Sequence, residues 1–104
     1  MVERRRYTRW VRPLDGRWRG LSGEAICRIA DISWGGCFIQ SIAEPSPGEP
    51  TIVSVDVGGV WVEIPGRIVY VEKAMGFSVQ FDPLTADQME GLRPLLGEPP
   101  PAAR

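Results

Sequence analysis

The stretch Asp31-Ile32-Ser33-Trp34-Gly35-Gly36 separates two short apolar runs of the chain. Residues 24–30 come before it and residues 37–40 come after it, and both runs have the apolar content of buried strands. A polar segment that ends in glycine is typical of a turn between two strands. We therefore expect residues 31–36 to form a corner that joins two neighbouring strands.

The side chains of this corner offer more than a turn requires. Asp31 supplies a carboxylate acceptor and Ser33 a hydroxyl group. Gly35 and Gly36 allow positive φ and let another molecule approach the backbone closely. These features predict a ligand site, although Asp31 capping the turn and the glycines serving turn geometry alone remain alternatives. Trp34 has two interpretations, either packing or contacting a partner, or stacking on a ligand.

The charge of the chain is divided unevenly along its length. Residues 1–28 carry eight arginines against three acidic residues, a net charge of +5. Residues 29–104 carry four basic residues against ten acidic ones, a net charge of −6. A basic arm on an acidic body suggests an anionic partner for the arm. Guanidinium groups bind phosphate and the O6/N7 edge of guanine bidentately; the alternative is a solvated basic tail.

The rest of the chain predicts short strands and one helix. Asp15-Gly16 is a hairpin-turn signal with a short strand on each side, and Pro65-Gly66 is an interruption between two strands. Residues 43–50 hold three prolines and predict irregular structure. Six or seven short strands in one small domain favour an antiparallel barrel. The further strands are expected at residues 51–57, 60–64, 67–71 and 76–81, and Gly20–Gly23 is expected to be a turn.

A short helix is expected after residue 85. Thr85 is a suitable N-cap, and Gln88 stands at the capping-box position three residues later. The expected apolar stripe of this helix consists of Met89, Leu92, Leu95 and Leu96.

The composition limits the class of protein. A chain of 104 residues with 43% apolar and 24% charged residues fits one globular domain. No apolar run approaches the roughly 20 residues that span a bilayer, and no secretory signal follows the charged start, so we expect a cytoplasmic protein without a membrane partner. Cys27 and Cys37 are expected to be free thiols rather than a disulfide. The absence of histidine removes the commonest general base and metal ligand, so we expect no enzyme, metal or cofactor.

Three segments together resemble a PilZ domain, a bacterial receptor for the second messenger cyclic di-GMP. Arg5-Arg6-Tyr7-Thr8-Arg9 is an Arg-x-x-x-Arg motif, and the corner at residues 31–36 is an Asp-x-Ser-x-x-Gly motif. Gly76-Phe77-Ser78-Val79-Gln80-Phe81 is similar to the closing strand of that family. The resemblance covers residues 4–96.

The resemblance implies an all-β fold with one short C-terminal helix, namely a six-stranded antiparallel PilZ-type barrel. Residues 1–9 would form a flexible arginine arm, and residues 10–96 would form the barrel with its terminal helix. Residues 97–104 are expected to be a disordered, proline-rich tail.

The resemblance also implies a set of ligand-binding residues. Arg4 precedes the first motif, where an arginine accompanies the uptake of an intercalated pair of ligands. Tyr70 is a weaker candidate for the site, with core packing as the alternative. The full set of residues expected to bind cyclic di-GMP is Arg4, Arg5, Arg9, Asp31, Ser33, Gly35, Gly36 and Tyr70.

The chemistry of cyclic di-GMP fits these residue types. Its two phosphodiesters and guanine O6/N7 edges suit arginines, and an ionised carboxylate suits the guanine N1/N2 donors. The expected function is a sensor or adaptor that closes its arm over the ligand and signals through an unidentified effector protein. One alternative is a PilZ-like protein-interaction module that binds no nucleotide. Another is a small nucleic-acid-binding barrel, which the sequence pI of about 5.4 disfavours.

Overall fold

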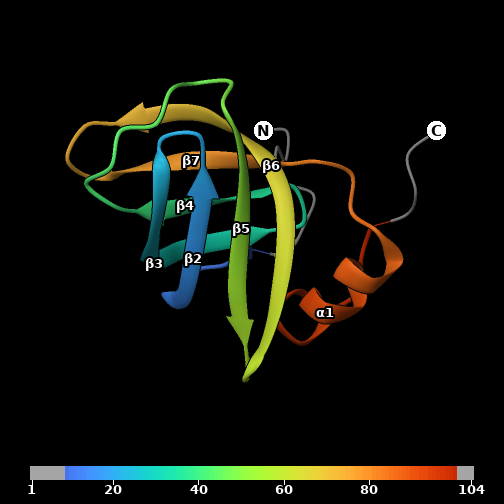
Figure 1. Ribbon diagram of the computed structural model, residues 1–104. Helices are drawn as coiled ribbons and strands as arrows, with labels where there is room; N and C mark the ends of the chain where they lie inside the picture. Colours follow the sequence, from blue (N-terminus) through green and yellow to red (C-terminus); the bar gives the residue numbers. More distant parts are fainter. Residues whose placement is uncertain (1–8, 101–104) are drawn as a thin grey trace, which may run out of the picture.

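The computed structural model describes residues 9–100, and six of its strands close into an antiparallel barrel (Figure 1). The strands follow one another around the barrel in the order β3-β2-β5-β6-β7-β4, and pairing between β3 and β4 closes it. This confirms the predicted six-stranded barrel with one short helix. The elements are β1 (Arg9–Trp10), β2 (Leu14–Gly20), β3 (Gly23–Ser33), β4 (Gly36–Gln40), β5 (Pro50–Val57), β6 (Val60–Glu72), β7 (Gly76–Phe81) and α1 (Ala86–Leu96).

The two ends of the chain fall largely outside the described residues. Of the expected arginine arm only residue 9 is described, as part of β1. Of the expected proline-rich tail residues 97–100 are described. The predictions that concern residues 1–8 and 101–104 therefore lie outside this structure.

Alternating side chains of the strands fill the barrel. In β5 the residues at positions 51, 53, 55 and 57 are buried, and in β7 the residues at positions 77, 79 and 81 are buried. Trp18 of β2 lies edge-on to Phe77 of β7, with ring centroids 5.2 Å apart. The strands expected at residues 51–57 and 76–81 are thus present, and one face of each packs into the common core.

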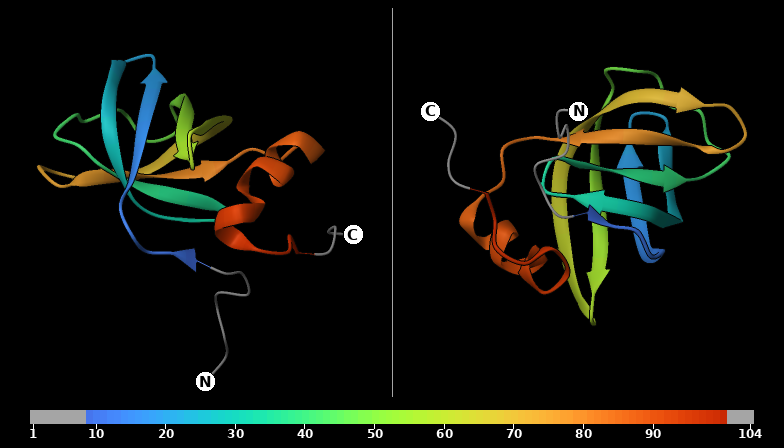
Figure 2. Two further views of the ribbon diagram at one scale, coloured as in Figure 1. Left: turned by 90° about the horizontal axis from the view of Figure 1, so that it is seen from below. Right: turned by 180° about the vertical axis from the view of Figure 1, so that it is seen from behind.

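Helix α1 lies beside β5 and β6 at one end of the barrel and also contacts β1 (Figure 2). The capping box is present: the Gln88 backbone N–H donates to the Thr85 hydroxyl at 3.1 Å, and the Gln88 side chain accepts from the Thr85 N–H at 2.8 Å. Leu92 and Leu96 are buried against the barrel. Within residues 9–100 no helix has the length and apolar character needed to cross a membrane.

Two predicted breaks lie inside continuous strands. Asp15-Gly16 belongs to β2 rather than to a hairpin turn, and Gly16 pairs with both β3 and β5. Glycine is required there because a Cβ at position 16 would overlap the Ile29 side chain of β3. Pro65-Gly66 belongs to β6, since Pro65 stands where the ladder to β7 ends and needs no N–H there. Its carbonyl accepts from the Asp82 N–H at 2.9 Å. Both dipeptides are therefore tolerated within strands for local packing reasons.

The expected corner at residues 31–36 is also shorter than predicted. Strand β3 continues to Ser33, and only Trp34 and Gly35 form the bend before β4. Trp34 is buried in the core, which agrees with the packing interpretation and not with ligand stacking. Neither glycine of this corner has a positive φ, so the left-handed backbone that glycine allows is not used here.

A buried carboxylate fixes the loop between β4 and β5. Glu49 is only 7% exposed, and its carboxylate accepts hydrogen bonds from the Ser22 N–H, the Ser22 hydroxyl and the Ser46 N–H at 2.8–2.9 Å. Burial opposes ionisation of this group, but the hydrogen bonds outweigh it and hold the pKa of Glu49 below its usual range. The proline-rich loop is thereby attached to the predicted turn between β2 and β3.

Candidate functional site

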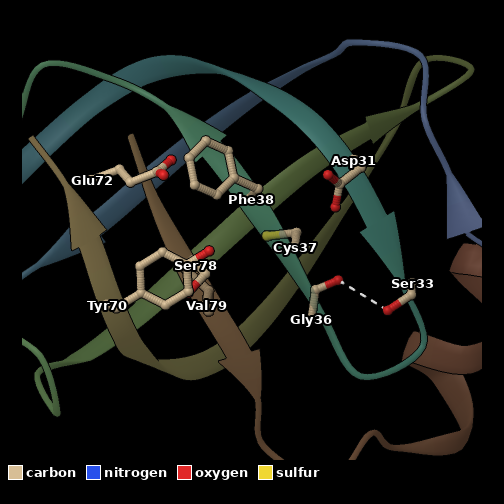
Figure 3. A pocket seen from close by; sticks show the side chains of 9 residues that line it. All are labelled: Asp31, Ser33, Gly36, Cys37, Phe38, Tyr70, Glu72, Ser78 and Val79. Atoms are coloured by element: carbon tan, nitrogen blue, oxygen red, sulfur yellow. Dashed lines mark hydrogen bonds between the residues drawn. The ribbon is translucent and has the colours of Figure 1, made fainter. Parts of the chain in front are cut away.

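A hollow of about 420 Å³ lies on the outer face of the barrel, over β3, β4, β7 and β6 (Figure 3). Phe38 and Ser78 on its floor alternate with buried core residues of the same strands, and the core residues Cys37 and Val79 also border it. The residues that line it are Asp31, Ser33, Gly36, Cys37, Phe38, Tyr70, Glu72, Ser78 and Val79.

One row of cross-strand neighbours crosses the floor of this hollow. Asp31 of β3 pairs with Phe38 of β4, which pairs with Ser78 of β7, which in turn pairs with Tyr70 of β6. Directly opposed residues on a sheet place their side chains on the same face. The row therefore brings together a carboxylate, two aromatic rings and a hydroxyl from two strand pairs, β3–β4 and β6–β7, that are distant from each other in sequence.

A β-bulge determines the outward direction of Asp31. The register of β3 against β4 shifts between Ile29 and Asp31, so Ala30 is the extra residue. Regular alternation would place Asp31 on the same side as Ile29, which is fully buried. The bulge reverses this, and Asp31 faces the hollow.

A second bulge acts in the same way on Tyr70. The register of β6 against β7 shifts between Ile68 and Tyr70, and Ile68 is buried. Tyr70 is instead 52% exposed and lines the hollow, so the core interpretation of this residue was wrong.

Ser33 and Gly36 form the rim beside the bend, whereas the expected site residue Gly35 does not line the hollow. The Ser33 hydroxyl accepts from the Gly35 N–H at 3.3 Å and approaches the Gly36 carbonyl at 3.5 Å. Ser33, rather than Asp31, therefore supports the turn. Gly36 lies so close to β7 that a Cβ would overlap the carbonyl oxygen of Val79. Gly35 is exposed and has open space around it.

Strand β1 connects the arginine motif to this rim. Arg9 is the Cα partner of Ser33, and Trp10 is the partner of Ile32. The last arginine of the first motif thus stands in register with the serine of the second motif. Arg4 and Arg5 lie outside the described residues.

The electrostatic character of the described part of the hollow is acidic. Asp31 and Glu72 contribute two carboxylates, and none of the described lining residues is a cation. Among the side chains of residues 10–100 neither carboxylate has a hydrogen-bond or ion-pair partner, and the buried Ser78 hydroxyl oxygen has none either. This arrangement offers acceptors for N–H donors and rings for stacking, and it needs added cations to hold an anion.

The two cysteines are free thiols, as predicted. Burial raises the pKa of Cys27 to about 11, and burial also raises the pKa of Cys37 above its ordinary value. Cys37 reaches the hollow but remains a neutral thiol at neutral pH. In the described part of the chain no cluster of three His, Cys, Asp or Glu side chains has the arrangement of a metal site.

Five lining residues were not among the expected site residues: Cys37, Phe38, Glu72, Ser78 and Val79. Cys37 and Val79 are buried core residues that border the hollow. Phe38 and Ser78 alternate with buried neighbours, so strand alternation alone would place them on the outer face. Glu72 stands beyond the bulge of β6, and no local sequence signal indicates that it would share a hollow with Asp31.

Comparison with known proteins agrees with the fold and the motifs. The PilZ domain family model matches residues 3–98. The chain belongs to the PilZ domain family. This is a family of binding domains rather than catalysts; its members generally bind cyclic di-GMP and interact with effector proteins. No curated protein sequence matches the chain.

Two solved structures share the fold of this PilZ domain. One is the Bacillus subtilis inhibitor of motility (MotI/DgrA), with a TM-score of 0.73 and 18% identity over 90% of this chain. This chain spans 50% of that protein's length. The other is the PilZ domain of CeSA from a cellulose-synthesizing bacterium, with a TM-score of 0.65 and 17% identity. It covers 84% of this chain and 93% of its own.

Proposed function

We propose that this PilZ domain binds cyclic di-GMP in the hollow over β3, β4, β6 and β7 and works as a cytoplasmic sensor. The observation that carries the proposal is the pairing of Arg9 with Ser33, which anchors the arginine motif at the rim of the hollow. Asp31, Ser33 and Gly36 of the second motif line the same hollow. Arg4 and Arg5 stand five and four residues before Arg9 in the sequence and reach the ligand from the arm.

The charges of the two parts complement each other. Cyclic di-GMP carries two negative phosphodiester charges. The only charged groups in the described lining of the hollow are carboxylates, which are also negative. The arginines of the arm supply the missing cations, which bind phosphates and the O6/N7 edges of guanine. Asp31 accepts hydrogen bonds from the N1 and N2 donors of a guanine, and Tyr70 provides a ring beside it.

The energetics are consistent with an affinity in the micromolar range. A good bidentate arginine–guanine pair contributes roughly 1–3 kcal/mol of discrimination. Ordering a flexible segment costs roughly 2–5 kcal/mol. Several such contacts together with stacking leave about −8 kcal/mol, which corresponds to a micromolar Kd. The arm therefore has to contribute more than one contact.

The output of this sensor passes to another protein. Closure of the arm over the ligand changes the surface around β1, and α1 contacts β1 directly. We place the effector contact on this altered surface. Hydrogen exchange of residues 4–9 measures the closure: it slows at saturating cyclic di-GMP, and unchanged exchange would contradict an arm that closes.

Calorimetric titration tests the binding itself. Cyclic di-GMP is titrated alongside GTP and cyclic GMP into the wild-type chain and into the Arg9→Ala and Asp31→Ala variants. Arg17→Ala is the matched control, because Arg17 is an exposed arginine of β2 outside the hollow. Binding that is specific for cyclic di-GMP, lost in both site variants and retained in the control is the expected result. If the wild-type chain gave no heat of binding, the proposal would be wrong. The alternative function, a protein-interaction module that binds no nucleotide, would then replace it.

A further inference from the structure

We propose that Glu72 is a second guanine-reading carboxylate, so that the hollow selects a cyclic dinucleotide with two guanines over one with a single guanine. In this arrangement Asp31 accepts from the N1 and N2 donors of one guanine, and Glu72 accepts from the same edge of the other. The inference rests on the proposed function and assigns the base specificity of the same site.

The two carboxylates stand on opposite sides of the hollow (Figure 3). Asp31 comes from β3 and Glu72 from β6, with β4 and β7 between them. Three strand spacings of about 4.8 Å, together with the two-residue offset of Glu72 from Tyr70 along β6, give a separation of about 16 Å along a flat sheet, and the curvature of the barrel shortens it. A cyclic dinucleotide carries its two bases on opposite sides of its ring, which matches two separated acceptors.

Glu72 differs from several other carboxylates of the chain in having no evident structural role. Glu49 accepts three hydrogen bonds, Glu90 pairs with Arg93 at 2.8 Å, and Asp15 lies 3.8 Å from Arg28. The Glu72 side chain makes no hydrogen bond or ion pair with any of residues 10–100, the residues whose side chains are described, and it faces a hollow that already holds Asp31. A carboxylate that faces a dianionic ligand is unfavourable unless the ligand donates hydrogen bonds to it.

The donor pattern of the bases makes such a carboxylate selective. Guanine presents two adjacent donors, N1–H and N2–H, which one ionised carboxylate accepts together. Adenine presents one N6 donor beside the N1 acceptor, and the lone pair of that acceptor is repelled by a carboxylate. Glutamate therefore favours guanine, whereas glutamine, with one carbonyl oxygen and one amide N–H, pairs with the adenine edge.

The backbone holds Glu72 in a defined position. Its carbonyl accepts from the Met75 N–H at 2.9 Å, and Glu72 is the cross-strand partner of Gly76. The bulge after Ile68 changes which residues of β6 face outward. As a result Tyr70 and Glu72 lie on the outer face of the barrel. Gly76 has no side chain, and the Phe38 ring lies in the space that a Cβ would enter. Phe38 thus forms the wall between the two carboxylates.

Titration of three ligands into the wild-type chain and Glu72→Gln tests this specificity. The ligands are cyclic di-GMP, cyclic GMP–AMP with one guanine and one adenine, and cyclic di-AMP. The wild-type chain is expected to prefer cyclic di-GMP over cyclic GMP–AMP by about tenfold or more, the discrimination of one good two-bond base contact. Glu72→Gln lowers the affinity for cyclic di-GMP and raises that for cyclic GMP–AMP, so the preference falls to about one. Glu72→Ala weakens cyclic di-GMP binding without improving cyclic GMP–AMP binding.

Glu63→Gln is the matched control, because Glu63 is an exposed glutamate of the same strand that does not line the hollow. It leaves all three affinities unchanged. An equal change for all ligands in Glu72→Gln, or tighter binding of cyclic di-GMP, would overturn the inference, since both results describe charge repulsion rather than base reading. Wild-type protein that binds no cyclic di-GMP refutes the proposed function as well, so the two failures are distinguishable.

Discussion

Replacement of Gly36 by alanine tests whether this glycine is needed for close packing of two strands or for the approach of a ligand to the backbone. The sequence offered both Gly35 and Gly36 as places where a ligand approaches the backbone. The structure gives Gly36 a different requirement, because a Cβ there would overlap the carbonyl oxygen of Val79. It would also lie 3.2 Å from the carbonyl carbon of Val79 and 3.3 Å from the Cα of Gln80. All three atoms belong to the backbone of β7.

The magnitude follows from what has to move. A flexible side chain could give way at little cost, but Gly36 and Gln80 are cross-strand partners in the barrel wall. Relief therefore requires β4 and β7 to separate locally, which is an overpacking strain of about 1–3 kcal/mol. For a chain of 104 residues this corresponds to a fall in Tm of about 5–14 °C.

Urea unfolding of the nucleotide-free chain measures this cost. Gly35→Ala is the control, because position 35 has no atom within 4 Å of an added Cβ and no positive φ. We expect its unfolding free energy to stay within about 0.5 kcal/mol of the wild type. If Gly36→Ala were as stable as Gly35→Ala, the close approach of β4 to β7 would be wrong. If Gly35→Ala lost cyclic di-GMP affinity at full stability, the ligand would approach the backbone at position 35.

Three further predictions concern stability and reactivity. Because the folded-state pKa of Glu49 lies below the unfolded value of about 4.3, ionised Glu49 stabilises the fold above that pH and the contribution is lost as pH falls through the folded-state pKa. Acid titration of unfolding should therefore show a shallower decline for Glu49→Gln than for the wild type. Thr85→Ala should lower the unfolding free energy by about 0.5–2 kcal/mol through loss of the helix cap, and Thr85→Ser should retain most of it. Cys27 and Cys37 should react slowly with a thiol reagent at pH 8 in the folded chain and rapidly in urea, because burial raises the pKa of both thiols; rapid reaction without urea would contradict their burial.

Local sequence patterns predicted much of the fold. The alternation of residues 51–57 and 76–81 identified β5 and β7, since a strand shows its two faces with a period of two. The capping pair Thr85 and Gln88 located the start of α1. Strand alternation and the capping pair depend only on residues that are close together in the sequence. The amino-acid sequence is therefore sufficient to predict these elements.

The dipeptides typical of turns were misleading for a physical reason. Gly16 and Gly66 allow another strand to come close, and neither residue requires a positive φ. A glycine that makes room for a neighbouring strand looks the same in sequence as a glycine that makes a turn. Only the identity of the neighbouring strand distinguishes the two cases.

The candidate site shows the same division. The sequence by itself determined which chemical groups the two motifs supply to the hollow. These are the motif residues Asp31, Ser33 and Gly36, and the arginine segment that ends in β1. The tertiary structure alone decided that Asp31 and Tyr70 face outward and share a hollow with Glu72. Both directions depend on bulges in β3 and β6, and a bulge is a property of two paired strands. Side-chain alternation is encoded locally, but the register shift that reverses it arises only when the two strands pair.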